Sequence, residues 1–514
     1  MPIPIFLQGK VVQLRLLLIF FGIVTLFLPL SFAPLFDLDE GAFSEATREM
    51  LHSGNYLTTY LDGALRFDKP ILIYWLQAFS VKLFGLNEFA LRFPSALAGA
   101  VWALAIWSFT KRYFSEKSAF FATLFMLASL QINIITKAAI ADSLLNLFIA
   151  TSIFSAWSYI KSNKKSYLYA SFALIALGTL TKGPVAIMIP LIVVTSYLLI
   201  KKRYKLLLKS LFNPIGILIF LAIAAPWYIL EYLDQGQKFI DGFFLKHNLE
   251  RFSSTLESHR GSLLYYIPVI LVGFLPFTSI LIGTIKRVKT IFKDNLQLYL
   301  LIWALFVIIF FSLSGTKLPH YVIYGYTPLF ILMGYEASKR FKSINFLTLM
   351  PIIVLFIILF ILPFAIKYID IKNLYIKEML ADFNTIFNYQ YLIYVALAAI
   401  LTVALKYSKL KIELKAFFIA LIFTSLVNFV VIPSYGKLAQ QPIKDAALYA
   451  KKHNLKIIRF HITKPSFLVY LESKSLKKEP SSGDVLLLKA GSLKRLKSYK
   501  VLFNKGGIYL VKLK

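Results

Sequence analysis

The stretch FDLDEGAFSEATREMLHSGNYLTTYLDGALRFDKPILIYWLQAFSVKL, residues 36–83, separates the first apolar run of the chain from the second. It carries a large share of the 25 acids of the chain: Asp37, Asp39, Glu40, Glu45, Glu49, Asp62 and Asp68. It also contains Arg48, Arg66 and Lys69. Charges placed beside an apolar span are costly and therefore tend to be functional, so this stretch is the first candidate for a site.

The composition is that of a membrane protein. Apolar residues make up 58% of the 514 residues, above the usual share of about 45–50% in soluble domains. The formal net charge is +32, but most basic residues form short clusters between apolar runs, as the positive-inside rule predicts. We therefore expect no nucleic-acid partner. The chain has no cysteine, which excludes disulfides, thiolate metal sites and cysteine nucleophiles.

Apolar runs recur along the chain and predict about 13 transmembrane helices. They lie at residues 16–35, 93–110, 118–135, 141–160, 167–180, 184–200, 214–230, 263–285, 296–313, 321–335, 346–366, 391–405 and 416–432. Every second loop is basic, which places the N-terminus in the cytoplasm and the loop of residues 36–88 outside. We interpret the first run as a retained span and expect a multi-pass protein of the cytoplasmic (inner) membrane, surrounded by membrane lipids. Residues 1–432 form the predicted membrane domain.

Residues 433–514 differ in composition and predict a small α/β domain outside the membrane. QP followed by KDAALYAKKH indicates a helix. The segments KIIRFHI, SFLVYL, DVLLLKA and GIYLVKL have the content of short strands. Because the candidate residues precede this tail, we expect the membrane site to form without it.

Two pairs in the first loop are candidates for chemistry, each with a structural alternative. Asp39 and Glu40 follow a span and are either functional or, together with Asp37, the N-terminal cap of a helix. Asp68 and Lys69 precede Pro70, which suits the first turn of a helix in the interface. Lys69 is either a point-charge partner for a lipid phosphate or an anchor that snorkels to the interface. We expect Arg92 to snorkel in the same way.

Five segments, in order, carry a family resemblance: DLDEGAFSEATREM, FDKPILIYWLQAFSVKLFGLNEFALRFPSAL, KAAIADSLL, LGTLTKGPVAIMIP and SGTKLPHYVIYGYTP. They are similar to the ArnT-like branch of the protein O-mannosyltransferase superfamily, membrane glycosyltransferases of the GT-C type. The resemblance implies a membrane all-α fold of about 13 spans with interfacial helices in the first external loop. It also implies a donor sugar on a polyprenyl phosphate and an envelope acceptor, which is lipid A, another glycan or a protein.

The resemblance assigns roles to individual positions. The catalytic candidates are Asp39, its neighbour Glu40 and the second acid Asp142. The candidates for binding the donor phosphate are Lys69, Lys317, Arg251 and Tyr321, and His320 lies in the same loop as Lys317. Asp68 and His247 match positions that bind a divalent metal ion, zinc or magnesium, in some members. Thr181-Lys182-Gly183-Pro184 resembles a loop motif of the family and lacks the rest of a P-loop.

The chain also departs from the family pattern. Many members have Arg and Tyr at the positions of Ala42 and Phe43, so one phosphate contact and one hydroxyl are missing. Arg48, Arg66 or Arg251 could compensate for the missing arginine. We therefore do not carry the aminoarabinose specificity of this branch over, and the sugar, a hexose or a pentose, stays open.

The chemistry that fits these residues is displacement of a polyprenyl phosphate from an anomeric carbon. A carboxylate would act as general base toward the acceptor hydroxyl, worth about 10²–10⁴-fold, and Lys69 would stabilise the leaving phosphate. Direct attack with one base predicts inversion at the anomeric carbon. The alternatives are a transporter or flippase of polyprenyl-linked lipids, a ligase-like transferase of a preassembled glycan, and a membrane scaffold for the tail.

Overall fold

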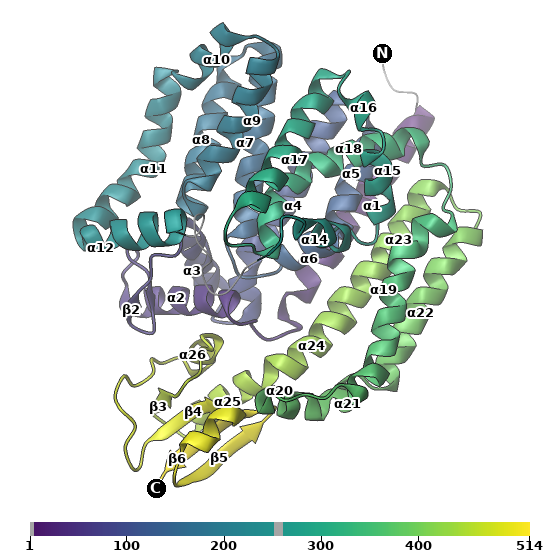
Figure 1. Ribbon diagram of the computed structural model, residues 1–514. Helices are drawn as coiled ribbons and strands as arrows, with labels where there is room; N and C mark the ends of the chain where they lie inside the picture. The colour runs from purple at the N-terminus through teal and green to yellow at the C-terminus, as the bar shows by residue number, and fades with distance from the viewer. Residues whose placement is uncertain (1–4, 251–260) are drawn as a thin grey trace.

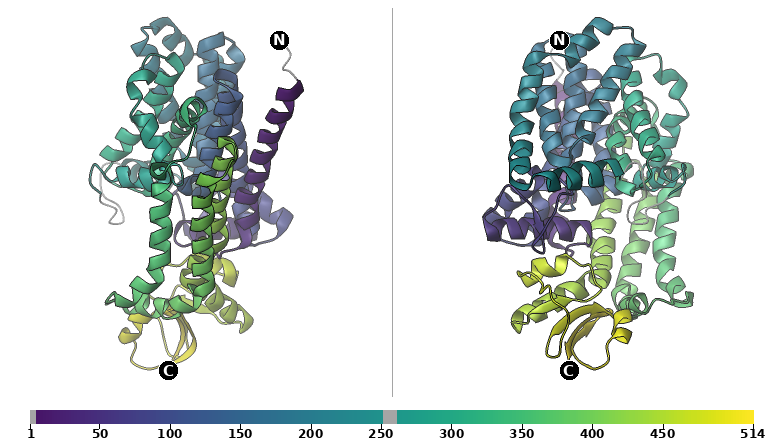
Figure 2. Two further views of the ribbon diagram at one scale, coloured as in Figure 1. Left: turned by 90° about the vertical axis from the view of Figure 1, so that its right-hand side faces the viewer. Right: turned by 60° about the vertical axis from the view of Figure 1, so that its left-hand side comes forward.

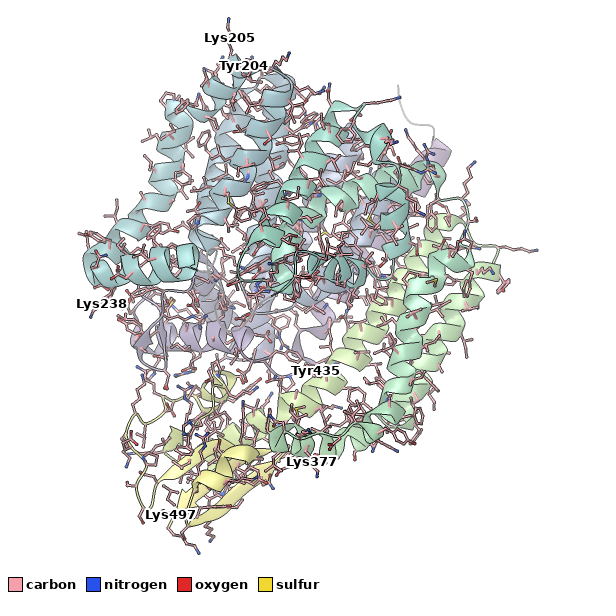
Figure 3. All side chains as sticks on the ribbon, in the orientation of Figure 1. Tyr204, Lys205, Lys238, Lys377, Tyr435 and Lys497 are labelled. Carbon is pink, nitrogen blue, oxygen red and sulfur yellow. The ribbon has the colours of Figure 1, made fainter. Side chains whose placement is uncertain are left out.

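The computed structural model describes residues 5–250 and 261–514. Helices form an elongated bundle, and a small domain with the C-terminus lies at one end of it (Figure 1, Figure 2). Tyr204 and Lys205 project from the opposite end, whereas Lys497 projects from the small domain (Figure 3). Helix α1 begins at the end of the bundle opposite the C-terminus (Figure 2), which is also the end from which Tyr204 projects (Figure 3).

The membrane part consists mainly of α-helices with short breaks. In chain order its helices are α1 (Ile5–Gly22), α4 (Glu88–Tyr113), α5 (Glu116–Ala128), α6 (Leu130–Ile135), α7 (Asp142–Ser162), α8 (Lys165–Lys182), α9 (Val185–Ile200), α10 (Tyr204–Leu211), α11 (Pro214–Gln235), α12 (Gln237–Phe239), η3 (Ile240–Glu250), α14 (Tyr266–Gly273), α15 (Thr278–Ile285), α16 (Val288–Ile291), α17 (Asn295–Leu313), η4 (Pro319–Gly325), α18 (Tyr326–Arg340), α19 (Phe346–Ala365), α22 (Tyr389–Tyr407), α23 (Ile412–Leu426), η7 (Val427–Val431) and α24 (Ile432–Ala439). Several begin at polar N-caps: the side chains of Asn87, Ser115, Asn213 and Asp294 each accept a hydrogen bond from a backbone amide of the first turn. Such caps satisfy amides that have no partner within the helix.

Among the described residues, eight helices or joined helices are long and apolar enough to cross a membrane. They are Gln13–Ser31, Glu88–Tyr113, Asp142–Ser162, Tyr204–Gln235, Asn295–Leu313, Phe346–Tyr368, Tyr389–Tyr407 and Ile412–Ala439. Other predicted runs are interrupted, for example at Ser129 between α5 and α6 and at residues 274–277 between α14 and α15. The helical membrane fold is confirmed, and the number of 13 spans stays a prediction.

The first loop folds against the end of the bundle that faces the small domain. It contains α2 (Asp39–Ser53), the hairpin β1 (Tyr60–Leu61) and β2 (Ala64–Leu65), and α3 (Leu72–Phe84). The turn Asp62-Gly63 has positive φ at both residues, 53° and 72°, the conformation that closes a two-residue hairpin. On α3, Tyr74 is buried against Phe43 of α2, whereas Phe79 is exposed, as expected for a helix in the interface.

The C-terminal domain consists of α25 (Gln441–Lys452), β3 (Ile457–Arg459), α26 (Ser466–Leu471), β4 (Val485–Lys489), η8 (Ala490–Arg495), β5 (Tyr499–Lys505) and β6 (Ile508–Leu513). The strand order is β3-β4-β6-β5, with β3 and β4 parallel and the other pairs antiparallel. Side chains alternate between two cores: α25 and α26 cover one face, and α20 (Leu374–Met379) contributes Leu374 to the other. The small α/β domain is confirmed, while its boundary at residue 433 stays a prediction.

One predicted strand is wrong. SFLVYL forms the helix α26, in which Phe467, Leu468, Val469 and Leu471 are all buried. A short apolar run that is buried on every side has no alternation to distinguish a strand from a helix. In addition, the strand β5 was not predicted, because its pattern is interrupted by exposed polar residues.

Candidate active site

The candidate residues gather at the end of the bundle that faces the C-terminal domain. Asp39 is the first residue of α2, and its exposed side chain lines a cavity of about 270 Å³. His320 of η4 lines the same cavity, together with Lys137 and with apolar residues such as Phe32 and Ile432. A cavity that combines an apolar wall with a few convergent polar groups is typical of a ligand site.

His320 lies at the centre of the charged residues. It interacts electrostatically with Asp142, Lys182, Asp39 and Lys69, which come from four separate segments of the chain. Burial lowers the pKa of the His320 imidazole, an effect that the charge of Asp142 only partly opposes. The ring is therefore neutral near pH 7 and can donate or accept a hydrogen bond without adding a charge.

Asp142, the second predicted acid, is buried and fully partnered. It begins α7, and its Oδ1 accepts hydrogen bonds from the Lys182 ammonium at 2.7 Å and from the Tyr324 hydroxyl at 2.7 Å. Lys182 Nζ also lies 2.8 Å from the Tyr324 hydroxyl, so the three groups form a closed triad. A carboxylate held by an ammonium and a phenol is poorly suited to accept a proton, and it fixes the end of α8 against η4 instead.

Sequence reasoning did not assign Lys182 and Tyr324 to the site. Both lie inside segments that carry the family resemblance, LGTLTKGP and SGTKLPHYVIYGYTP, so the signal was present in the sequence. Their importance depends on the distance between α8 and η4, which spacing along the chain does not reveal.

Glu40 and Arg92 form a buried ion pair. Glu40 Oε1 lies 2.6 Å from Arg92 Nε, and its two oxygens also accept hydrogen bonds from the backbone amides of Phe36 and Ala139. Arg92 further donates to the carbonyl oxygens of Leu30, Ala33 and Pro34. The expectation that Arg92 snorkels is wrong. Its guanidinium N–H groups donate to backbone carbonyl oxygens at a bend of the chain, and these oxygens need hydrogen-bond partners inside the protein. The catalytic role of Glu40 stays a prediction, and its contacts favour a role in positioning its neighbour Asp39.

The alternative that the acids cap α2 is supported only in part: Asp39 and Glu40 lie in the first turn, where they suit the helix dipole, but no side-chain cap forms. The N-cap position is Leu38, and no side chain accepts a hydrogen bond there. Asp37 instead accepts hydrogen bonds from Ser466 of the C-terminal domain. Within the described part of the chain, the Asp39 side chain makes no hydrogen bond or ion pair, which leaves its carboxylate open to the cavity.

The predicted phosphate ligands have different surroundings. Lys69 is half-buried and donates a hydrogen bond to the Asp68 carbonyl at 2.8 Å. Lys317 is buried and donates to the Ser314 carbonyl at 2.8 Å. The Tyr321 ring packs against Phe311 with 5.1 Å between ring centroids, and the Lys182 ammonium lies 5.9 Å from its centroid. Arg251 lies outside the described residues, so its assignment stays a prediction.

Arg66 is the described residue best placed to replace the arginine missing at Ala42. Arg48 is bound by Glu45 through two hydrogen bonds of 2.8 and 2.6 Å. Arg66, in contrast, is buried 3.1 Å from Asp68 and interacts electrostatically with Asp39. Its Nε is buried and has no hydrogen-bond partner among the described residues, an exception to the rule that buried donors are paired.

The predicted metal site does not assemble among the described residues. They contain no group of three or more His, Asp or Glu side chains that could hold an ion. Asp68 faces the guanidinium of Arg66, and the side chain of His247 lies outside the described set, although its backbone belongs to η3. The zinc or magnesium site stays a prediction.

Comparison with known proteins shows the family and the fold of the chain. Residues 68–230 match the family described as dolichyl-phosphate-mannose-protein mannosyltransferase. The undecaprenyl phosphate-alpha-4-amino-4-deoxy-L-arabinose arabinosyl transferase of Aeromonas hydrophila is 31% identical over 322 residues, which cover 62% of this chain and 58% of the relative. An uncharacterized protein of Aquifex aeolicus is 31% identical over 59% of this chain and 68% of its own length.

The fold is that of a solved relative. The crystal structure of ArnT from Cupriavidus metallidurans bound to undecaprenyl phosphate superposes with a TM-score of 0.80 at 19% identity, covering 97% of each chain. The chain is thus a multi-pass membrane protein of the GT-C fold. It belongs to the ArnT-like and protein O-mannosyltransferase superfamily. The match to the Aeromonas hydrophila enzyme spans less than three fifths of that relative.

Proposed function

We propose that this chain is an inverting glycosyltransferase that moves a hexose or pentose from a polyprenyl-phosphate donor to an envelope acceptor. The acceptor is lipid A, another glycan or a protein. The gathering of Asp39, Lys69, Asp142 and Lys182 around His320, beside a cavity with apolar walls, carries the proposal. Relatives such as the arabinosyl transferases of Aeromonas hydrophila and Erwinia tasmaniensis, which are named for an undecaprenyl-phosphate sugar, support this donor class.

In the proposed reaction, Asp39 accepts the proton of the acceptor hydroxyl as its oxygen attacks the anomeric carbon. The bond between that carbon and the phosphate oxygen breaks, and the polyprenyl phosphate leaves with the bonding electron pair. Lys69, assisted by Arg66, neutralises the charge that grows on this phosphate. Attack from the face opposite the leaving group inverts the anomeric configuration.

The arrangement of charges favours an enzyme over a transporter. Asp142 is the first residue of α7 and Lys182 the last of α8, so the pair lies at helix ends. A transport pathway would place ionisable groups near the middle of the spans. We further propose that the N-terminus is cytoplasmic and that the site and the C-terminal domain face outward. The basic loop of residues 201–205 supports this orientation, since it lies at the end of the bundle away from the site (Figure 3).

Mass spectrometry of envelope lipids and glycoproteins, from cells with and without the protein, tests the proposal. We expect one species to lack the mass of a single sugar in the deletion and to regain it when the wild-type chain is returned, but not when Asp39→Asn is returned. A loss of a whole preassembled glycan would support the ligase-like alternative. Identical envelopes in both cells would contradict glycosyl transfer.

A further inference from the structure

Asp37 and Gly41 of the first loop meet Ser466 where this loop contacts the C-terminal domain. Asp37 Oδ1 accepts a hydrogen bond from the Ser466 amide at 2.9 Å, and Asp37 Oδ2 accepts one from the Ser466 hydroxyl at 2.6 Å. A Cβ on Gly41 would lie 2.4 Å from Asp37 Oδ1 and 2.6 Å from the Ser466 nitrogen. Because real Cβ atoms do not approach neighbours so closely, only glycine at position 41 lets the backbone of α26 reach α2.

The same surface is held by further polar contacts. Asp62, at the turn of the β1–β2 hairpin, lies 2.6 Å from Arg459 Nη2 and accepts a hydrogen bond from the Ser475 amide at 2.8 Å. Glu49 lies 3.4 Å from the Lys474 ammonium. Glu88, at the start of α4, lies 2.5 Å from Lys444.

Tyr470 of α26 completes the contact. Its hydroxyl donates a hydrogen bond to Glu88 at 2.9 Å and accepts one from the Leu35 amide at 2.7 Å. Much of the acidic cluster of the first loop therefore binds the C-terminal domain instead of substrate, although the tail was expected to be dispensable for the site.

We infer that the C-terminal domain positions the catalytic acid: Ser466, through Asp37 and Gly41, fixes the backbone that carries Asp39. Asp39 lies between the two residues that α26 contacts. Its side chain makes no hydrogen bond of its own among the described residues, so the backbone of this segment is what places its Cβ and limits where the carboxylate can reach. Glu40 and Arg92 hold the same segment from the bundle side. This inference rests on the proposed function.

The full-length chain offers a direct test with matched variants. Ser466→Ala removes one hydrogen bond to Asp37, Gly41→Ala forces α26 away, and Ser466→Thr restores the hydroxyl. The control is Lys478→Ala, which removes an exposed ion pair with Asp484 in the same domain. The assay uses a lipid extract of the native membrane as substrate. Mass spectrometry follows the release of polyprenyl phosphate.

We expect kcat to fall about 10- to 100-fold in Ser466→Ala and Gly41→Ala, since small displacements of a reacting group have effects of this size. KM for the donor should stay unchanged, Ser466→Thr should recover most of the rate, and Lys478→Ala should match the wild type. A purely structural role would lower the melting temperature and leave kcat per folded molecule intact. Wild-type kcat in both folded variants, or an equal loss in Lys478→Ala, would overturn the inference.

A cross-link provides a second test that does not depend on the folding of Gly41→Ala. The chain has no cysteine, so Glu49→Cys and Lys474→Cys can be joined by a short reducible bis-maleimide without background. In the Ser466→Ala chain, the cross-link should raise kcat toward the wild-type value, and reduction of the linker should reverse the gain. A cross-linked chain that stays as slow as Ser466→Ala would contradict positioning by the domain. Absence of any release by the wild type would contradict the proposed function itself, whereas normal release by every variant would contradict only this inference.

Discussion

The site has two regions of opposite character that meet at His320. The rim, formed by Asp39 and Lys69 of the first loop, is exposed or half-buried and contains a carboxylate without a described partner. The wall, formed by Asp142, Lys182 and Tyr324, is closed by mutual hydrogen bonds, with Asp142 and Tyr324 buried and Lys182 half-buried. Asp39 and Asp142, which look equivalent in the sequence, therefore differ in their ability to accept a proton.

The difference separates chemistry from architecture. A general base must be reachable by the acceptor and free to take a proton, which fits Asp39. A buried carboxylate with an ammonium partner holds its charge and fixes its neighbours, which fits Asp142. The rim should therefore respond to substitution in kinetics and binding, and the wall in stability.

The largest effect on stability is expected from Lys182→Met, which removes the ammonium partner of Asp142 in the wall. The change leaves Asp142 as an uncompensated buried charge, and side chains of this pair are only 10% and 5% exposed. We expect the free energy of unfolding to fall by about 3–5 kcal/mol. Urea unfolding in detergent measures it.

A double variant isolates the cause of that loss. Asp142→Asn combined with Lys182→Met removes both charges and should cost less than the sum of the single changes. Additive losses of stability would show that the two side chains do not interact and would contradict the structural role given to the wall.

Lys69→Ala tests the rim. Loss of a charge-assisted hydrogen bond is worth about 1.5–3 kcal/mol, so the Kd for a polyprenyl phosphate should rise about 10- to 100-fold, with little change in melting temperature. Native mass spectrometry with undecaprenyl phosphate measures the Kd. Lys82→Ala, on α3 of the same loop, serves as the matched control, and an unchanged Kd in Lys69→Ala would reject the phosphate role.

Asp62→Asn is a reference for the substitutions in both regions, because Asp62 belongs to neither the rim nor the wall. Burial would raise the pKa of Asp62, but hydrogen bonds from Ser475 and the charge of Arg459 lower it below its usual value. The folded chain thus binds fewer protons than the unfolded chain, and stability from Asp62 is present above the unfolded pKa of about 4 and lost at lower pH.

We expect Asp62→Asn to cost about 1.5 kcal/mol at pH 7. Melting curves of both chains between pH 3 and pH 7 check the sign. The difference in stability between the wild type and Asp62→Asn should be constant above about pH 5 and shrink below about pH 4. A difference that grows on acidification would contradict the ion pair with Arg459.

Tyr324→Phe should have the smallest effect and sharpens the role of the wall. It removes one hydrogen bond to Asp142 and leaves the Lys182 pair in place, at a cost of about 1 kcal/mol. The Kd for undecaprenyl phosphate should not change. A loss of binding as large as in Lys69→Ala would move Tyr324 from the wall to the substrate site.

The sequence was sufficient for the membrane fold and for the first-loop helices α2 and α3, whereas the location of the site stays a prediction. Apolar runs, basic loops and the positions of Asp39 and Lys69 are local features that periodicity and charge reveal. The partners of those residues are set by tertiary distances. Arg92 was expected to snorkel because the sequence does not reveal the bend at residues 30–34, whose carbonyl oxygens accept its hydrogen bonds.

The same limit explains the C-terminal domain. Its helix α25 and the strands β3, β4 and β6 follow from local pattern, whereas α26 has no alternation that distinguishes a helix from a strand, because most of its side chains are buried. Its contacts with Asp37 and Gly41 join positions more than 400 residues apart. No pattern in either segment alone predicts that the tail supports the first loop.

The most direct test of the account compares single-turnover release of polyprenyl phosphate by Asp39→Asn and by the wild type at saturating donor. We predict that the variant folds, binds undecaprenyl phosphate with the wild-type Kd, and releases product about 10²–10⁴-fold more slowly, the usual contribution of a general base. Release by folded Asp39→Asn at the wild-type rate would contradict the central claim that Asp39 activates the acceptor.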